Sequence, residues 1–374
     1  MNGNRVSGKV PSFNKIIRNI EAVDKGELEK VVGLVGDADV IIFGATGRSN
    51  KSLRRGLGGI EGKRIITRKD PDYPGRNIFE VLETSEKQGK EVLLVVNSCS
   101  GTTETPRYLI EDVATYIENT GTKKVKIAAI TANLDSPIGK IAQKYGVALK
   151  LKGTKVQSKT SEQASSLGMM NDLFELGSAM LFQETREALN NGQSWQQARK
   201  QIFIEMAEIG KRLDKFVECK PYRKLITKLS TRAHVVIGGY GPSEEVAEEL
   251  AIRLGHVKES IGDRVDIVGS SASHVRPGDT LIIISCSGET RCVLKWIEKY
   301  RAVKETYVFS IVGKKSPISE RSDGSFIINK PVNRFYSAAA LLLSSIPLDL
   351  VRELESNGLV LPLEITNWSH SDVE

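Results

Sequence analysis

The stretch Asn97-Ser98-Cys99-Ser100-Gly101-Thr102-Thr103 returns later in the chain as Ile284-Ser285-Cys286-Ser287-Gly288-Glu289-Thr290. Each copy directly follows a short run of apolar residues, VLLVV before the first and LIII before the second. Such a run predicts a buried strand, and the small polar residues after it predict a turn. The copies lie 187 residues apart in a chain of 374, which indicates a duplicated domain rather than a short repeat.

A helical pattern, TPRYLIEDVATYIE, follows the first copy. Hydroxyl and backbone N–H groups at such a strand-to-helix junction can converge on an anion, because the helix N-terminus carries a partial positive charge. We therefore predict two phosphate-binding turns, the first cup at residues 98–103 and the second cup at residues 285–290. A plain polar turn between strand and helix is the alternative interpretation.

Strand and helix patterns alternate on both sides of the midpoint, which is typical of parallel sheets with helices on both faces. The fold class predicted is α/β, with two three-layer αβα domains. Between about residues 165 and 230 the pattern is almost purely helical. We predict a first domain with an N-terminal helix over 1–195, a helical connector over 196–229, and a second domain with a C-terminal helix and tail over 230–374.

The composition limits the classes of protein that the chain can belong to. Hydrophobic residues make up 40% and charged residues 26%, enough apolar side chain for two cores. The sequence shows neither a membrane-spanning apolar run nor a signal peptide, and its four cysteines lack metal or disulfide spacing, so we expect a soluble cytoplasmic protein. The net charge of +7 comes from scattered basic residues, which favours small anions over nucleic acid or membrane partners. Homo-oligomerisation stays open.

Both cups match the S-x-S-G-x-T signature of the sugar isomerase (SIS) domain family, which the chain resembles. Three further stretches are similar to motifs of the 6-phospho-3-hexuloisomerases and archaeal phosphosugar isomerases within it: Gly44–Ser49, Ala251–His256 and Gly168–Phe182. The resemblance implies two tandem SIS-type domains related by pseudo-twofold symmetry, with a phosphorylated sugar as the ligand.

The resemblance also implies which residues bind the phosphate and which do the chemistry. The implied phosphate-binding residues are Ser49, Ser98, Ser100, Thr102 and Thr103 in the first half, and Ser243, Ser285, Ser287 and Thr290 in the second. Arg48, beside Ser49, is a further candidate, because its guanidinium can pair with a phosphate in bidentate fashion; a surface arginine is the alternative interpretation. Glu175 is implied as the catalytic carboxylate. The chain departs from the family pattern at Thr102, where an acidic residue is usual, and at Pro242, where arginine is usual. Aligning the two halves places Tyr336 opposite Glu175.

An isomerase of this kind needs a base that takes a proton from the carbon beside a carbonyl. Glu175, on an apolar helix pattern, is the candidate base, and His256 is the candidate for opening the sugar ring or polarising the carbonyl. The structural alternatives are a surface glutamate paired with lysine and a histidine that caps a helix. Proton transfer through an enediol requires no metal and no cofactor.

The predicted function is therefore phosphosugar isomerisation, on an aldose–ketose or ketose–ketose pair. One alternative is isomerase or deglycase chemistry on an amino-sugar phosphate. A second alternative is a phosphosugar sensor that binds without turnover, because the second half lacks a carboxylate at Tyr336. The sequence does not identify the sugar, nor does it decide whether one or both sites are active.

Overall fold

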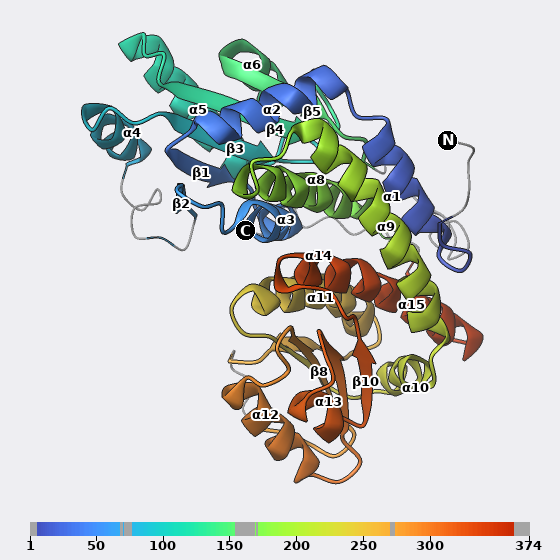
Figure 1. Ribbon diagram of the computed structural model, residues 1–374. Coiled ribbons are helices and arrows are strands. Elements are labelled where there is room, and N and C mark those ends of the chain that lie inside the picture. The colour runs from blue at the N-terminus through green and yellow to red at the C-terminus, as the bar shows by residue number, and fades with distance from the viewer. Residues whose placement is uncertain are drawn as a thin grey trace. The chain divides into compact units, whose positions relative to one another are not determined.

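The computed structural model describes residues 6–67, 70, 77–153, 169, 171–269 and 274–362. The chain forms two compact units, each built around one parallel sheet (Figure 1). The first-sheet unit comprises Ile16–Thr154, Leu173–Phe203 and His370–Glu374; the second-sheet unit comprises Met1–Lys15, Lys155–Asp172 and Ile204–Ser369. The domain boundaries predicted from the sequence and the pseudo-twofold relation between the halves stay predictions.

The first sheet has the strand order β2-β1-β3-β4-β5, with every neighbouring pair parallel. Its strands are β1 (Val40–Gly44), β2 (Arg64–Ile66), β3 (Val92–Asn97), β4 (Val125–Thr131) and β5 (Gly146–Lys150). Every residue of β1 and β3 is buried. This is the pattern of central parallel strands covered by helices on both faces.

The second sheet repeats this topology in the order β7-β6-β8-β9-β10, again with every neighbouring pair parallel. Its strands are β6 (Val235–Gly238), β7 (Val265–Ile267), β8 (Thr280–Ser285), β9 (Tyr307–Val312) and β10 (Gly324–Ile327). Strand β8 is thus the counterpart of β3, and each ends at one of the two cups. The prediction of two αβα domains with parallel sheets is confirmed.

The helices flank the sheets and connect the strands (Figure 1). Up to the end of the first sheet they are α1 (Pro11–Glu21), α2 (Lys25–Asp37), α3 (Gly47–Leu57), α4 (Ile78–Lys87), α5 (Glu104–Thr120) and α6 (Pro137–Tyr145). The helical stretch between the sheets contains α8 (Asp172–Asn190), α9 (Trp195–Glu218) and α10 (Lys220–Leu229). The helices after it are α11 (Pro242–Glu259), α12 (Arg291–Arg301), α13 (Pro317–Arg321), α14 (Val332–Leu343) and α15 (Ser345–Ser356).

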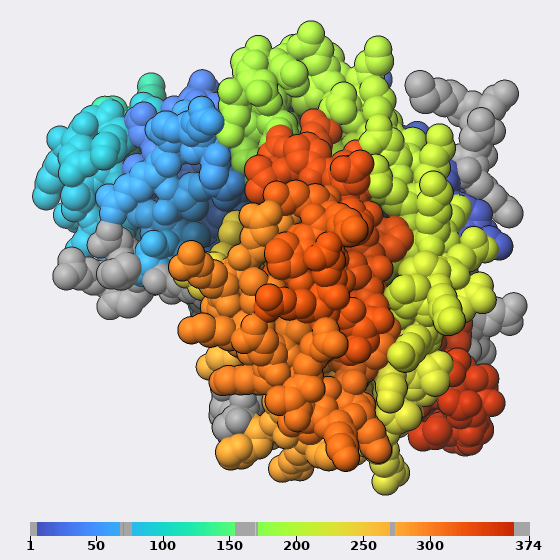
Figure 2. Space-filling model, turned by 60° about the horizontal axis from the view of Figure 1, so that its bottom comes forward, coloured from blue at the N-terminus to red at the C-terminus, as the bar shows by residue number. Residues whose placement is uncertain are grey.

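One face of each sheet packs against equivalent helices. In the first-sheet unit, Leu94 and Val96 of β3 belong to a core cluster with Ile110 and Val113 of α5. In the second-sheet unit the corresponding cluster joins β8 to α12 and α13. Figure 2 shows the orange segments, which include α12 and α13, packed as one continuous body. Burial of these apolar faces holds the helix that follows each cup against its sheet.

One stretch among the described residues, Val332–Ser356, is long and apolar enough to cross a membrane. It consists of α14 and α15, and 78% of its most apolar window is buried within the protein. Such burial is typical of core helices, so the stretch is weak evidence for a membrane span. The cytoplasmic location stays a prediction.

Candidate functional site

The first cup is a turn that links β3 to α5 and is held by its own hydroxyl groups. Ser98 Oγ accepts from the N–H of Gly101 at 3.3 Å, and Ser100 Oγ accepts from the N–H of Thr102 at 3.2 Å. The Thr103 hydroxyl lies 3.3 Å from Ser98 Oγ, and Thr103 is the residue before the first turn of α5. The predicted phosphate-binding hydroxyls are therefore gathered at a helix N-terminus, where an anion is stabilised.

The second cup repeats these contacts between β8 and α12. Ser285 Oγ accepts from the N–H of Gly288 at 3.1 Å, and Ser287 Oγ accepts from the N–H of Glu289 at 3.3 Å. Thr290 stands in the position of Thr103, directly before the helix. The two sequence repeats thus form the same two side-chain hydrogen bonds, with serine as the acceptor in each.

A glycine in each cup allows a neighbouring helix to approach. Gly101 has φ of 70° and Gly288 has φ of 68°. A Cβ at either position would lie 2.0 Å from a serine hydroxyl oxygen, that of Ser136 in the first unit and that of Ser316 in the second. These two serines begin α6 and α13. The S-x-S-G-x-T pattern therefore requires glycine both for its backbone angle and for space.

Glu175 lies on α8 and is 4% exposed. The Ser49 hydroxyl of α3 donates to Glu175 Oε1 at 2.8 Å, and the Ser52 hydroxyl donates to the Glu175 carbonyl oxygen at 2.8 Å. Asn97, the last residue of β3, donates from Nδ2 to the Ser49 carbonyl oxygen at 3.1 Å. The carboxylate is thus tied, through α3, to the strand that leads into the first cup.

The charge of Glu175 also acts electrostatically on Cys99 in the first cup. Burial, together with the Glu175 carboxylate, raises the pKa of the Cys99 thiol to about 12. The Cys99 side chain faces Gly153, where a Cβ would lie 2.3 Å from its sulfur. Cys99 is therefore a packed, protonated thiol at neutral pH, and Glu175 lies within electrostatic range of the cup.

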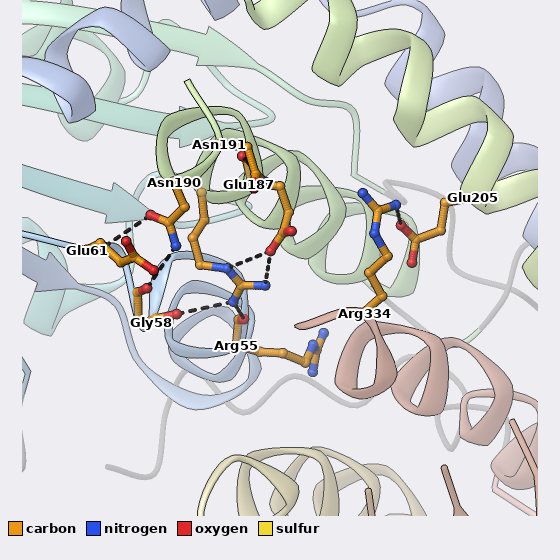
Figure 3. A network of polar contacts seen from close by, with 10 residues as sticks. Arg55, Gly58, Glu61, Glu187, Asn190, Asn191, Glu205 and Arg334 are labelled. Carbon is orange, nitrogen blue, oxygen red and sulfur yellow. Dashed lines mark hydrogen bonds and ion pairs between the residues drawn. The ribbon is translucent and has the colours of Figure 1, made fainter. Parts of the chain in front are cut away.

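Close packing of α3 against α8 positions the Ser49–Glu175 contact. A Cβ at Gly56 would lie 2.3 Å from Phe182 Cβ, so the two helices approach closely there. Farther along α8, Arg186 donates from Nη1 to the carbonyl oxygens of Arg55 and Gly58, each at 3.1 Å (Figure 3). The guanidinium satisfies carbonyls at the end of α3 that have no partner within that helix, and it fixes the relative position of the two helices.

The structure brings four of the predicted second-half residues to one cavity in the second-sheet unit. This cavity has a volume of about 580 Å³. Its wall includes the predicted residues Ser243, Ser285, Ser287 and Thr290, together with Tyr336. Two lysines that the sequence reasoning missed, Lys314 and Lys330, also line it. Both closely follow a strand, β9 and β10 respectively, at the carboxyl edge of the sheet, a position that could have identified them.

Two other predicted residues, Arg48 and His256, also lie buried on helices and outside the cups. Arg48 is at the start of α3, beside Ser49, and is 7% exposed. His256 is near the end of α11 and is not among the described residues that line the second cavity. The remaining predicted residue, Thr102, is exposed in the first cup. Among the described residues no group of three or more His, Cys, Asp and Glu could hold a metal ion.

The comparison with protein families identifies the second half of the chain. The SIS domain family matches residues 228–352, which span β6 to α15 and the second cup. Over residues 228–352 the chain is therefore similar to a SIS domain. The first half has the same strand order and the same cup, so the chain contains two SIS-type αβα domains.

Solved structures share the fold over nearly the whole chain. A candidate tagatose-6-phosphate ketose/aldose isomerase from Clostridium novyi is 14% identical, with a TM-score of 0.61 over 97% of this chain and 90% of that one. Tagatose-6-phosphate ketose/aldose isomerase from Escherichia coli is 14% identical, with a TM-score of 0.59 over 94% of each chain. Glucosamine-6-phosphate deaminase from Thermotoga maritima is 14% identical, with a TM-score of 0.53 over 94% and 97%.

One curated relative was found, an uncharacterised protein from Methanothermobacter thermautotrophicus. It is 35% identical over 100 residues, which cover 26% of this chain and 49% of the relative. The chain thus spans about half the length of the curated relative that it matches.

Proposed function

We propose that this protein is a phosphosugar isomerase that moves a carbonyl group along a hexose or hexulose phosphate by proton transfer through an enediol. The observation that carries the proposal is the buried Glu175 carboxylate, held by Ser49 within electrostatic range of the first cup. A fixed carboxylate beside an anion-binding turn places the base next to the group that binds the phosphate.

In this proposal the residues have separate roles. The hydroxyls of Ser98, Ser100, Thr102 and Thr103 bind the phosphate at the N-terminus of α5. Glu175 removes the proton from the carbon next to the carbonyl, which gives the enediol, and returns it to the former carbonyl carbon. Arg48 contributes positive charge, and His256 assists in opening the sugar ring. The similarity of the second half to a SIS domain and the fold shared with ketose/aldose isomerases support this assignment.

The experiment that tests the proposal follows solvent deuterium into the sugar. Fructose, glucose, mannose, glucosamine and hexulose 6-phosphates are incubated with the protein in D2O, and the carbon-bound deuterium is measured by NMR. Glu175→Gln keeps the acceptor for Ser49 but cannot take the proton, so exchange falls by about 100-fold or more while binding survives. Glu83→Gln is the matched control, because Glu83 is an exposed carboxylate on α4. Undiminished exchange in Glu175→Gln would contradict the role of Glu175.

The same panel separates isomerisation from amino-sugar chemistry. Glucosamine-6-phosphate deaminase from Thermotoga maritima shares the fold, so release of ammonia from glucosamine 6-phosphate is measured beside exchange. Ammonia release that depends on Glu175 would indicate the amino-sugar alternative.

A sensor that binds phosphosugars without turnover is the second candidate function. It is favoured by the second cavity, whose described lining residues include no carboxylate. Tight binding of a phosphosugar by the wild-type protein, with no exchange and no ammonia release on any member of the panel, would indicate a sensor.

A further inference from the structure

The second cavity differs from the first cup in the groups that could move a proton. Tyr336 of α14 lines it, at the position that the alignment of the two halves gives to Glu175. Burial raises the pKa of the Tyr336 hydroxyl above its ordinary value, so at neutral pH this group donates a hydrogen bond and does not act as a base. Burial likewise raises the pKa of the Cys286 thiol.

The rest of the described wall is suited to binding. Ser285, Ser287 and Thr290 of the cup line it together with Lys314 and Lys330, and its described residues include no carboxylate and no imidazole. In the first-sheet unit the loop after β4 reads Asn133-Leu134-Asp135, where the loop after β9 has Lys314-Lys315. Lys314 pairs with Glu289 of the second cup at 2.9 Å, and both of these side chains are more than half exposed. The described residues that line the cavity thus include no buried carboxylate like Glu175.

We propose that the second cavity is an effector site, which binds a sugar phosphate through the second cup and does not isomerise it. The proposal rests on the proposed function, because it assigns the reaction to the first cup and regulation to the second. The cavity volume of about 580 Å³ is within the range of sites that enclose small ligands.

The contacts of Lys330 connect this site to α9. Lys330 has 9% of its side chain exposed and forms an ion pair with Glu208 of α9, which holds the pKa of that carboxyl below its ordinary value. Four residues later Arg334 pairs with Glu205, a fully buried carboxylate on the same helix (Figure 3). A sugar phosphate in the cavity competes with Glu208 for Lys330. Helix α9 begins in the first-sheet unit and ends in the second-sheet unit. When Lys330 releases Glu208 and binds the phosphate, the change therefore acts on a helix that belongs to both units.

Binding stoichiometry tests whether the second cup is a site. Fructose 6-phosphate and, in parallel, inorganic phosphate are titrated calorimetrically into the wild type, Ser100→Ala and Ser287→Ala. We expect two equivalents per wild-type chain, and each variant weakens its own site by about 10- to 100-fold, the effect of losing one hydrogen bond to a charged group. In Ser100→Ala, the sugar bound at the second cup takes up no deuterium from D2O.

The Lys330 contact is tested by a pair of carboxylate variants on α9. Glu208→Gln removes the competitor for Lys330, so affinity at the second cup rises several-fold. Glu218→Gln is the matched control, because Glu218 lies on the same helix and pairs with Lys9 at 2.9 Å. Equal affinity in the two variants would show that Lys330 does not connect the cavity to α9.

Four outcomes distinguish failure of this proposal from failure of the isomerase. The effector site would be overturned if only one equivalent bound saturably, with that binding lost in Ser100→Ala and intact in Ser287→Ala. It would also be overturned if neither probe bound saturably. Deuterium exchange that persists in Glu175→Gln and disappears in Ser287→Ala would make the second cavity catalytic and also overturn it. Two bound equivalents with no exchange in the wild type would support the second site while contradicting the proposed isomerase.

Discussion

The Ser49 hydroxyl donates its proton to Glu175 Oε1 at 2.8 Å, across 126 residues of sequence. A serine hydroxyl has a single proton to donate, so in this arrangement Ser49 serves the carboxylate rather than a phosphate. The sequence suggested Ser49 as a phosphate ligand and Glu175 as a base, each by itself. The structure joins them, which makes Ser49 a positioning residue for Glu175 in the proposed reaction.

Ser49→Ala removes this donor, and we expect the turnover number to fall by about 10- to 100-fold, the effect of losing a hydrogen bond to a charged group. Ser49→Thr keeps the hydroxyl and should restore most of the rate. Because the phosphate is held by the first cup in this mechanism, KM should change much less than kcat. Steady-state kinetics on the phosphosugar that exchanges fastest provides the measurement.

Ser52→Ala is the matched control for that prediction. Ser52 lies on the same helix and also donates to Glu175, but to the carbonyl oxygen rather than to the carboxylate. Its loss should lower the free energy of unfolding by about 1 kcal/mol and leave kcat close to the wild-type value. A loss of kcat in Ser52→Ala as large as that in Ser49→Ala would mean that the carboxylate contact has no special role.

Gly101→Ala tests the space that the first cup requires. A left-handed backbone costs alanine about 1–2 kcal/mol, and the overlap of its Cβ with the Ser136 side chain adds about 1–3 kcal/mol. Gly121→Ala is the control, because Gly121 has nearly the same φ, 65°, with no atom within 4 Å of an added Cβ. Urea unfolding should therefore show a larger loss for Gly101→Ala, with phosphosugar binding at the first cup lost as well. Equal losses of unfolding free energy in the two variants would show that the Ser136 side chain moves away from the added Cβ at little cost.

The parts of the fold that the sequence predicted best are those where one local signal determines the structure. The runs VLLVV and LIII are wholly buried strands, and the S-x-S-G-x-T turns have matching hydrogen bonds in both halves. Each signal is local, because a buried parallel strand needs a continuous apolar run and the turn needs glycine at one fixed place.

The parts that could not be predicted depend on contacts between distant segments. Lys314 and Lys330 line the second cavity because β9 lies beside β8 and β10 lies beside β9, which depends on the strand order. His256 follows the apolar face of α11 closely enough to be buried with it, although a histidine near a helix end is usually polar surface. Local patterns do not determine such placements.

Lys258→Met tests a buried cation that supports the second sheet. The Lys258 ammonium has no exposed surface, donates to the carbonyl oxygens of Leu229 and Thr231 at 2.9 and 2.8 Å, and pairs with Asp263 at 2.9 Å. Removing it leaves Asp263 without this cation and should lower the free energy of unfolding by about 3–5 kcal/mol. Lys299→Met, an exposed lysine on α12, should change it by less than about 0.5 kcal/mol in a urea titration. Similar effects of the two substitutions would contradict the structural role of Lys258.

The reactivity of Cys99 tests whether Glu175 acts on the first cup. The pKa of this thiol is raised from 9.0 to about 12, and only the thiolate reacts with iodoacetamide. At pH 8 the thiolate fraction is therefore about 1,000-fold lower than for an ordinary thiol, and alkylation should accelerate as the pH rises from 9 towards 12.

Glu175→Gln separates the two causes of the raised Cys99 pKa. Burial keeps part of the rise in this variant, whereas the contribution of the carboxylate charge disappears. The alkylation rate of Cys99 at pH 8 should then increase several-fold, while that of Cys292 on α12 stays the same. Peptide mapping by mass spectrometry measures both rates in one sample, and a parallel rise at Cys292 would indicate general loosening of the protein. An unchanged Cys99 rate in Glu175→Gln would separate the carboxylate from the cup and remove the principal support for Glu175 as the base.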